Sequence, residues 1–135
     1  MGEIVAIIET SVYVDDLDQA EMFYRDILGL EVLTREPGRH VFFRVSDGML
    51  LIFDPRATTG GGTLTPHGAV GPGHFALGVR TEDFDGWRVR LENLGVAIED
   101  EVRWPGGGRS IYFRDPAGNS VELITPGVWG LPSGW

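Results

Sequence analysis

The sequence predicts an α+β fold built from two tandem β-α-β-β-β modules. The first observation is an internal repeat, because Gly-Arg-His-Val-Phe-Phe-Arg at 38–44 resembles Gly-Arg-Ser-Ile-Tyr-Phe-Arg at 108–114. In both copies a glycine turn follows, at Gly48 and Gly118, and then an apolar strand. The second observation is that a strand pattern and then a helix pattern precede each copy. Two copies of one unit indicate a duplication and not a solenoid, which needs more repeats.

The first module occupies residues 4–55. Its opening strand alternates apolar and polar residues from Glu9 onward, which is typical of a strand with one buried face. Asp15 and Asp16 are suited to cap the helix that follows, and Gly29 is suited to end it. The predicted elements are a strand over 4–14, a helix over 17–27, and strands over 31–36, 40–45 and 49–53.

The second module, residues 73–126, repeats this order after a linker at 56–72 that is rich in Gly, Thr and Pro. We expect His67, inside the linker, to be a solvated loop residue. The tail at 127–135 contains two tryptophans without periodicity, and we expect it to pack on the body or on a partner subunit. The elements predicted for the module are a strand over 73–80, a helix over 84–94, a strand over 96–104, and a hairpin over 108–126.

Composition narrows the class of protein. A length of 135 residues fits one domain, and a net charge of −9 argues against nucleic acid and anionic membranes as partners. The chain has no cysteine, which excludes disulfides and thiolate ligands and is compatible with a cytoplasmic protein. We see no signal-peptide pattern and no apolar stretch that is long enough to span a bilayer.

Strand parity places three ionisable residues on the face of the sheet that carries no helix. In the strands that contain Glu9, His74 and Glu122, the bulky apolar neighbours point to the opposite face. One imidazole and two carboxylates on neighbouring strands form a plausible ligand set for a divalent ion. The alternatives are a solvated Glu122, a histidine at position 74 that only makes hydrogen bonds, and a Glu9 that faces water or an arginine.

Three further residues are candidates for binding a small-molecule substrate. Tyr112 and Arg114 share one face of their strand and would contact substrate if that face is the concave one; otherwise Ile111 and Phe113 would face the pocket. Trp104 lies beside a glycine-rich loop and is a candidate pocket wall, although aromatic core packing is the commoner role.

The chain resembles the vicinal oxygen chelate superfamily, which includes glyoxalases, bleomycin-resistance proteins and extradiol dioxygenases. The similarity rests on motifs at 13–17, 23–30, 73–76, 113–119 and 121–123. It implies a curved mixed sheet with helices on the outer face, and a homodimer. It also implies a divalent metal (Zn, Ni, Mn or Fe) bound by His74 and Glu122, with Glu9 at a position where members often have histidine.

One departure from the family pattern limits the choice of reaction. The fourth ligand position falls on Leu51 or Ile52, which are apolar, so a four-ligand glyoxalase I site is not expected. Glu9 is then either a third ligand or a catalytic general base. The resemblance implies a metal-dependent isomerase, lyase or dioxygenase that acts on a substrate with vicinal oxygens. The alternative is a metal-free protein that binds drugs or metabolites, as bleomycin-resistance proteins do.

Overall fold

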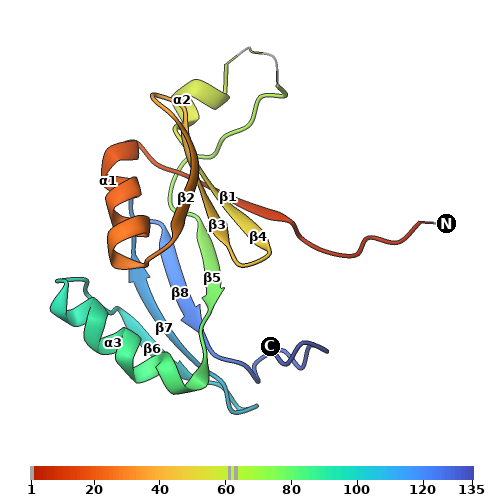
Figure 1. The fold of residues 1–135 in the computed structure, drawn as a ribbon, viewed down its shortest axis with the longest axis vertical. Coiled ribbons are helices and arrows are strands. Elements are labelled where there is room, and N and C mark those ends of the chain that lie inside the picture. The colour runs from red at the N-terminus through yellow and green to blue at the C-terminus, as the bar shows by residue number, and fades with distance from the viewer. Residues whose placement is uncertain (1, 61, 63) are drawn as a thin grey trace. The chain divides into compact units, whose positions relative to one another are not determined.

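The computed structural model describes residues 2–60, 62 and 64–135 and confirms the tandem β-α-β-β-β order (Figure 1). The chain divides into two compact units, Met1–Gly73 and His74–Trp135. Each unit contains its own four-stranded mixed sheet, in which the first strand pairs in parallel with the last and the other pairs are antiparallel. No helix among the described residues has the length and hydrophobicity needed to cross a membrane.

The first unit has the strand order β1-β4-β3-β2. Its helix is continuous with a π-helical segment, in which Leu28 N–H donates to the carbonyl of Phe23 at 3.2 Å. Within the predicted linker, Asp54 caps a short helix through the backbone N–H of Arg56. The elements are β1 (Glu9–Tyr13), α1 (Leu17–Met22), the π-helical segment (Phe23–Ile27), β2 (Glu31–Glu36), β3 (His40–Val45), β4 (Gly48–Phe53) and α2 (Pro55–Thr58).

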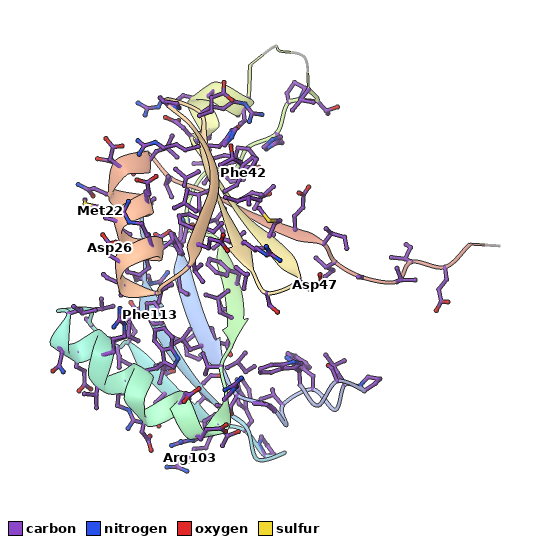
Figure 2. All side chains as sticks on the ribbon, in the orientation of Figure 1. Met22, Asp26, Phe42, Asp47, Arg103 and Phe113 are labelled. Carbon is purple, nitrogen blue, oxygen red and sulfur yellow. The ribbon has the colours of Figure 1, made fainter. Side chains whose placement is uncertain are left out.

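The core of the first unit lies between α1 and the sheet. Tyr24, Val41 and Phe43 are fully buried, and the rings of Tyr24 and Phe43 lie 5.6 Å apart. Met22 and Asp26 are on the solvent side of the helical segment (Figure 2). Because side chains alternate along a strand, burial of the odd-numbered β3 residues turns the even-numbered ones to the face without a helix.

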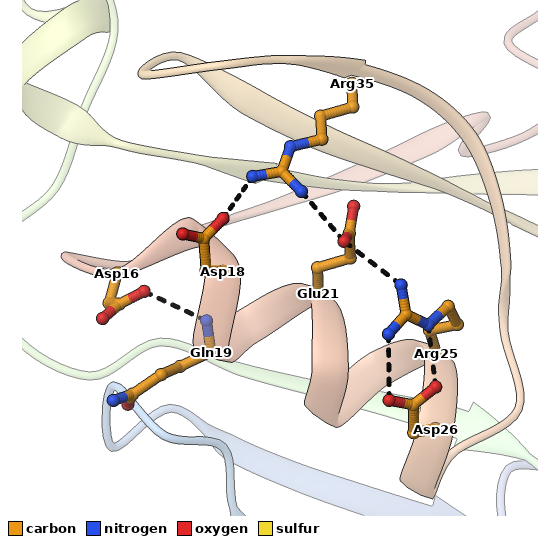
Figure 3. A network of polar contacts seen from close by, with 7 residues as sticks. All are labelled: Asp16, Asp18, Gln19, Glu21, Arg25, Asp26 and Arg35. Carbon is orange, nitrogen blue, oxygen red and sulfur yellow. Dashed lines mark hydrogen bonds and ion pairs between the residues drawn. The ribbon is translucent and has the colours of Figure 1, made fainter.

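A network of charged residues ties α1 to β2 (Figure 3). Asp16 accepts a hydrogen bond from the backbone N–H of Gln19 at 3.0 Å and so caps the helix. Arg35 of β2 reaches Glu21 at 2.9 Å, and Arg25 reaches the same carboxylate at 3.2 Å. Exposed ion pairs contribute little free energy individually, so we assign this network to fixing where the helix lies on its sheet.

The first predicted strand was too long. Residues 2–8 have no regular structure, and β1 begins only at Glu9. The reason lies in the register, because Glu9 pairs with Met49 and β4 itself begins at Gly48. The backbone N–H of Met49 donates to the carbonyl of Ile8 at 3.0 Å, and β4 has no further residues with which the preceding part of the chain could pair. A hydrophobic pattern alone does not make a strand where the neighbouring strand ends.

The second unit has the strand order β5-β8-β7-β6. Phe84 and Leu91 of its helix are fully buried, as are Ile111 and Phe113, so the helix covers the sheet face that carries the odd-numbered β7 residues. The predicted strand over 96–104 is shorter in the structure, because only four of its residues pair with β7. The elements are β5 (His74–Gly78), a 3-10 turn (Thr81–Asp83), α3 (Phe84–Asn93), β6 (Asp100–Arg103), β7 (Arg109–Arg114) and β8 (Ser120–Ile124).

Candidate functional site

The strand register of the second unit brings His74, Tyr112 and Glu122 to one sheet face. Glu122 of β8 stands opposite Ala76 and Tyr112, and His74 stands opposite Ser120, one step along the same face. His74 Nε2 lies 3.3 Å from Glu122 Oε1. The Glu122 side chain is 7% exposed and that of His74 is 51% exposed, so the pair is an almost buried carboxylate with a histidine that is open to solvent.

A chain of two hydrogen bonds holds the other oxygen of Glu122. The hydroxyl of Ser110, which is fully buried, donates to Glu122 Oε2 at 2.5 Å. The indole N–H of Trp104 donates in turn to the Ser110 oxygen at 2.8 Å. A buried carboxylate is costly unless it is hydrogen-bonded, and this chain satisfies Oε2 while Oε1 is directed at His74.

His74 is oriented by the backbone of the neighbouring strand. Its Nδ1 lies 3.2 Å from the carbonyl oxygen of Ser120, and a carbonyl can only accept, so Nδ1 carries the proton. In the neutral ring, Nε2 then presents a lone pair to Glu122 Oε1. Two acceptors at 3.3 Å repel each other unless a proton or a cation lies between them. A cation bound between the two atoms would relieve this repulsion.

Tyr112 completes this face of the sheet. Its ring is stacked with that of His74, with centroids 6.1 Å apart. Burial, and then the negative charge of Glu122, raises the pKa of Tyr112 above its ordinary value. The phenol therefore keeps its proton at neutral pH, and a hydrogen bond to Glu122 contributes to the shift.

Arg114, the other predicted substrate contact on β7, is held by its own neighbours. Its Nε donates to Glu99 at 2.8 Å, and its Nη1 donates to the carbonyl of Gly118 at 3.0 Å. These bonds direct the guanidinium to the turn and the outer edge of the unit. A role in substrate binding stays a prediction for this arginine.

Glu9 lies in the other unit, on β1, where it is exposed and lines a cavity of about 780 Å³. The two units have corresponding registers, because Ser11 stands opposite Leu51 as Ala76 stands opposite Glu122. This correspondence places Leu51, and not Ile52, at the position of Glu122, and Glu9 at that of His74. The described residues contain no group of three or more His, Cys, Asp or Glu that would hold a metal, so the role of Glu9 as third ligand or as general base stays a prediction.

The expectation that His67 is a solvated loop residue was wrong. Its Nδ1 lies 2.6 Å from the hydroxyl of Tyr13, and its ring packs edge-on against Phe53 with centroids 4.6 Å apart. The backbone N–H of His67 also donates to the carbonyl of Thr58 at 2.9 Å. The contact with Tyr13 joins residues 54 positions apart, and neither periodicity nor a local motif in the sequence indicates it.

The tail packs on the body of the second unit. Trp135 covers Gly78 at the end of β5, and the backbone N–H of Gly127 donates to the carbonyl of Gly134 at 2.8 Å. Gly78 lies on the same strand face as His74, since the two are four residues apart on β5. The last residue of the chain therefore borders the face that carries the His74–Glu122 pair.

This packing predicts that Gly78→Ala destabilises the chain by about 1–3 kcal/mol, the usual cost of overpacking. A Cβ at position 78 would lie only 2.8 Å from Cζ2 of Trp135. Urea unfolding should show this loss, and in a Trp135→Ala background the added cost of Gly78→Ala should largely vanish. The matched control is Gly86→Ala, where a Cβ meets nothing within 4 Å and a helical position favours alanine. Equal effects at positions 78 and 86 would contradict the packing.

Comparison with known proteins identifies the family of the chain. The sequence profile of the Glyoxalase/Bleomycin resistance protein/Dioxygenase superfamily matches residues 6–123. A solved structure described as lactoylglutathione lyase from Agrobacterium tumefaciens is 45% identical, with a TM-score of 0.92, and the match covers 96% of this chain and 100% of that one.

Two curated proteins match over shorter stretches. Metallothiol transferase FosB of Bacillus licheniformis is 39% identical over 42% of this chain and 37% of its own length. Glutathione transferase FosA of Serratia marcescens is 42% identical over 37% of this chain and 34% of its own length. The matches thus span about a third of the curated relatives. Because the profile spans most of the sequence, the chain belongs to the Glyoxalase/Bleomycin resistance protein/Dioxygenase superfamily.

Proposed function

We propose that this protein is a metal-dependent enzyme that acts on a small molecule with two adjacent oxygens, by lyase or isomerase chemistry of the glyoxalase type. The observation that carries the proposal is the facing pair of acceptors, His74 Nε2 and Glu122 Oε1, at 3.3 Å. The spacing suits two ligands of one ion, whose bonds to nitrogen and oxygen are about 2.1 Å long. The relative with 45% identity bears the name lactoylglutathione lyase, which supports this choice of reaction.

The surrounding residues have the properties of a shell around a metal site. A ligating histidine usually donates its second N–H to a carbonyl or carboxylate, as His74 Nδ1 does to Ser120. A bound divalent ion would polarise the substrate oxygens as a Lewis acid. The Tyr112 phenol, whose pKa is raised, stays protonated on the same sheet face as Glu122, and we propose that it donates a hydrogen bond to a substrate oxygen when substrate is bound. Glu9 is proposed as a third ligand or as the base that moves a proton between the substrate's carbon atoms.

Metal content tests this proposal. Protein purified without chelator should contain about one equivalent of Zn, Ni, Mn or Fe. Chelation should abolish turnover in a lactoylglutathione assay, and re-addition of one of these ions should restore it and raise Tm. Absence of metal, together with no stabilisation by any of the four ions, would overturn the proposal.

A second candidate function is metal-free binding of a drug or metabolite. Leu51 favours it, because this apolar residue stands where the second unit has Glu122 and is only 7% exposed. Under this reading the protein would bind a compound equally well with and without chelator, and it would show no turnover.

A further inference from the structure

The sheet face that carries His74 and Glu122 also carries an aromatic ring to which the proposed chemistry gives no role. A Cβ at position 78 would lie 2.8 Å from Cζ2 and 2.9 Å from Cζ3 of Trp135, and closer still to Cη2, the atom between them. A point outside the edge of the ring would be much farther from the two flanking atoms than from the middle one. The Cβ would therefore point into the face of the ring, so the indole lies flat on Gly78.

The tail holds this ring in a fixed position. The carbonyl of Trp135 accepts hydrogen bonds from the backbone N–H of Trp129 at 3.1 Å and of Leu131 at 3.0 Å. Gly134 makes two more, since its carbonyl accepts from the N–H of Gly127 and its own N–H donates to the carbonyl of Leu131, both at 2.8 Å. These bonds close the tail into a loop. A group that is ordered before a ligand arrives loses little conformational entropy on binding.

The β5 residues on this face become smaller toward the indole. His74 is followed on the same face by Ala76, which is exposed, and then by Gly78. Ala76 stands opposite Glu122. Residues two apart on a strand are separated by about 6.6 Å, so the indole begins one such step from Glu122. Only a methyl group of β5 lies between the carboxylate and the aromatic ring.

The indole lies lower on the sheet than the atoms proposed to hold the ion. A ring in van der Waals contact with the backbone is about 3.5–4 Å above it. His74 Nε2 and Glu122 Oε1, which lie 3.3 Å apart, are the far ends of longer side chains. A planar group that extends along β5 from a molecule held there would pass over the outer face of the indole, which is only partly buried. Stacked aromatic rings gain free energy beyond the area that they bury.

We propose that Trp135 is a specificity-determining residue of the His74–Glu122 site and favours substrates that carry a planar apolar group beside their two adjacent oxygens. This assignment rests on the proposed function and deepens it, because it names the class of substrate as aryl-substituted compounds. It also gives a reason for a glycine within β5, where a residue without a side chain weakens the strand. All of the residues involved belong to the second unit.

The test is titration calorimetry of zinc-loaded protein with benzohydroxamate and acetohydroxamate. The two probes present the same pair of adjacent oxygens and differ in a phenyl against a methyl group. We expect the parent to bind benzohydroxamate at least about 10-fold more tightly, because the phenyl ring is both buried and stacked. In Trp135→Ala this preference should fall below about 3-fold, through weaker binding of benzohydroxamate alone. An equal preference in the parent and in Trp135→Ala would overturn the inference.

Two further variants separate contact with the ligand from a structural role of the tail. Trp135→Phe retains an aromatic ring and should keep most of the preference for benzohydroxamate. Trp129→Ala is the matched control, because Trp129 belongs to the same tail and is 73% exposed, and it should bind both probes as the parent does. Parallel losses of both hydroxamates in Trp135→Ala would indicate a structural role only and would contradict the assignment.

Chelator competition with zinc distinguishes failure of this inference from failure of the proposed function. Trp135 is not a proposed ligand, so Trp135→Ala should bind zinc within about 3-fold of the parental affinity, unlike the loss expected for a ligand or its support. A parent that binds neither zinc nor the other three ions would overturn the proposed function and this inference with it. Zinc bound by both proteins, without a preference for the phenyl group that depends on Trp135, would overturn the inference alone.

Discussion

Replacing Glu122 with alanine is expected to weaken the binding of a divalent ion by at least about 100-fold. Loss of a residue that merely supports a ligand typically costs 10- to 100-fold in metal affinity, and Glu122 is itself the proposed ligand. The variant would leave only the imidazole of His74 in this unit, on an open face with 51% of its side chain exposed. Competition titration against a chromophoric chelator measures the change directly.

The matched control for this variant is Glu99→Ala. Glu99 is also a carboxylate of the second unit, but it is exposed and pairs with Arg114, so its loss should change metal affinity less than 3-fold. The same titration on Glu9→Gln distinguishes its two proposed roles, because a ligand would lower the affinity and a base would lower only turnover. Retention of parental affinity by Glu122→Ala would mean that the ion does not bind at this pair.

The fold could be predicted because the sequence contains two copies of the same strand and turn motif. The repeat at 38–44 and 108–114 becomes β3 and β7, each in the middle of the antiparallel part of its sheet. Strand parity also predicted that His74 and Glu122 share a face, because alternation needs no knowledge of the rest of the chain. Register then showed that they are near neighbours on that face.

The support for the pair could not be predicted. Ser110 is an ordinary polar residue in a strand. It donates a hydrogen bond to Glu122 only because the strand register places it opposite Ile124, next to that carboxylate. The role of Trp104 as a pocket wall stays a prediction, and nothing in the sequence indicates that its N–H donates to Ser110. Both contacts depend on how β6, β7 and β8 align, which local propensity does not specify.

The cavity of the first unit escaped prediction for a related reason. Thr58 and His67 lie in a stretch whose composition indicates only a loop. His67 is held in place by the bond from its backbone N–H to the Thr58 carbonyl and by its contact with Tyr13. Long-range contacts of this kind are set by the folded chain as a whole, so the sequence pattern could not reveal the lining.

The hydroxyl of Ser110 is expected to contribute strongly to the affinity of the site for a metal ion. Ser110→Ala removes the hydroxyl that joins Trp104 to Glu122 Oε2, so the carboxylate is held less firmly in the orientation that faces His74. We expect a 10- to 100-fold loss of metal affinity and a fall in the free energy of unfolding of about 1–3 kcal/mol, because a buried acceptor loses its donor. Chelator competition and urea unfolding give the two quantities.

Trp104→Phe separates orientation of the carboxylate from simple loss of stability. It removes the indole N–H and some packing but leaves the Ser110 hydroxyl free to donate to Glu122. The free energy of unfolding should therefore fall, while metal affinity should change less than about 5-fold. The reason is that Trp104 does not contact the carboxylate directly and acts on it only through Ser110. A purely structural role for Ser110 would instead make both variants lose affinity in proportion to their loss of stability. A change of affinity in Ser110→Ala that exceeds this proportion would show that the hydroxyl positions Glu122 for the ion, which is the role that the 2.5 Å hydrogen bond indicates.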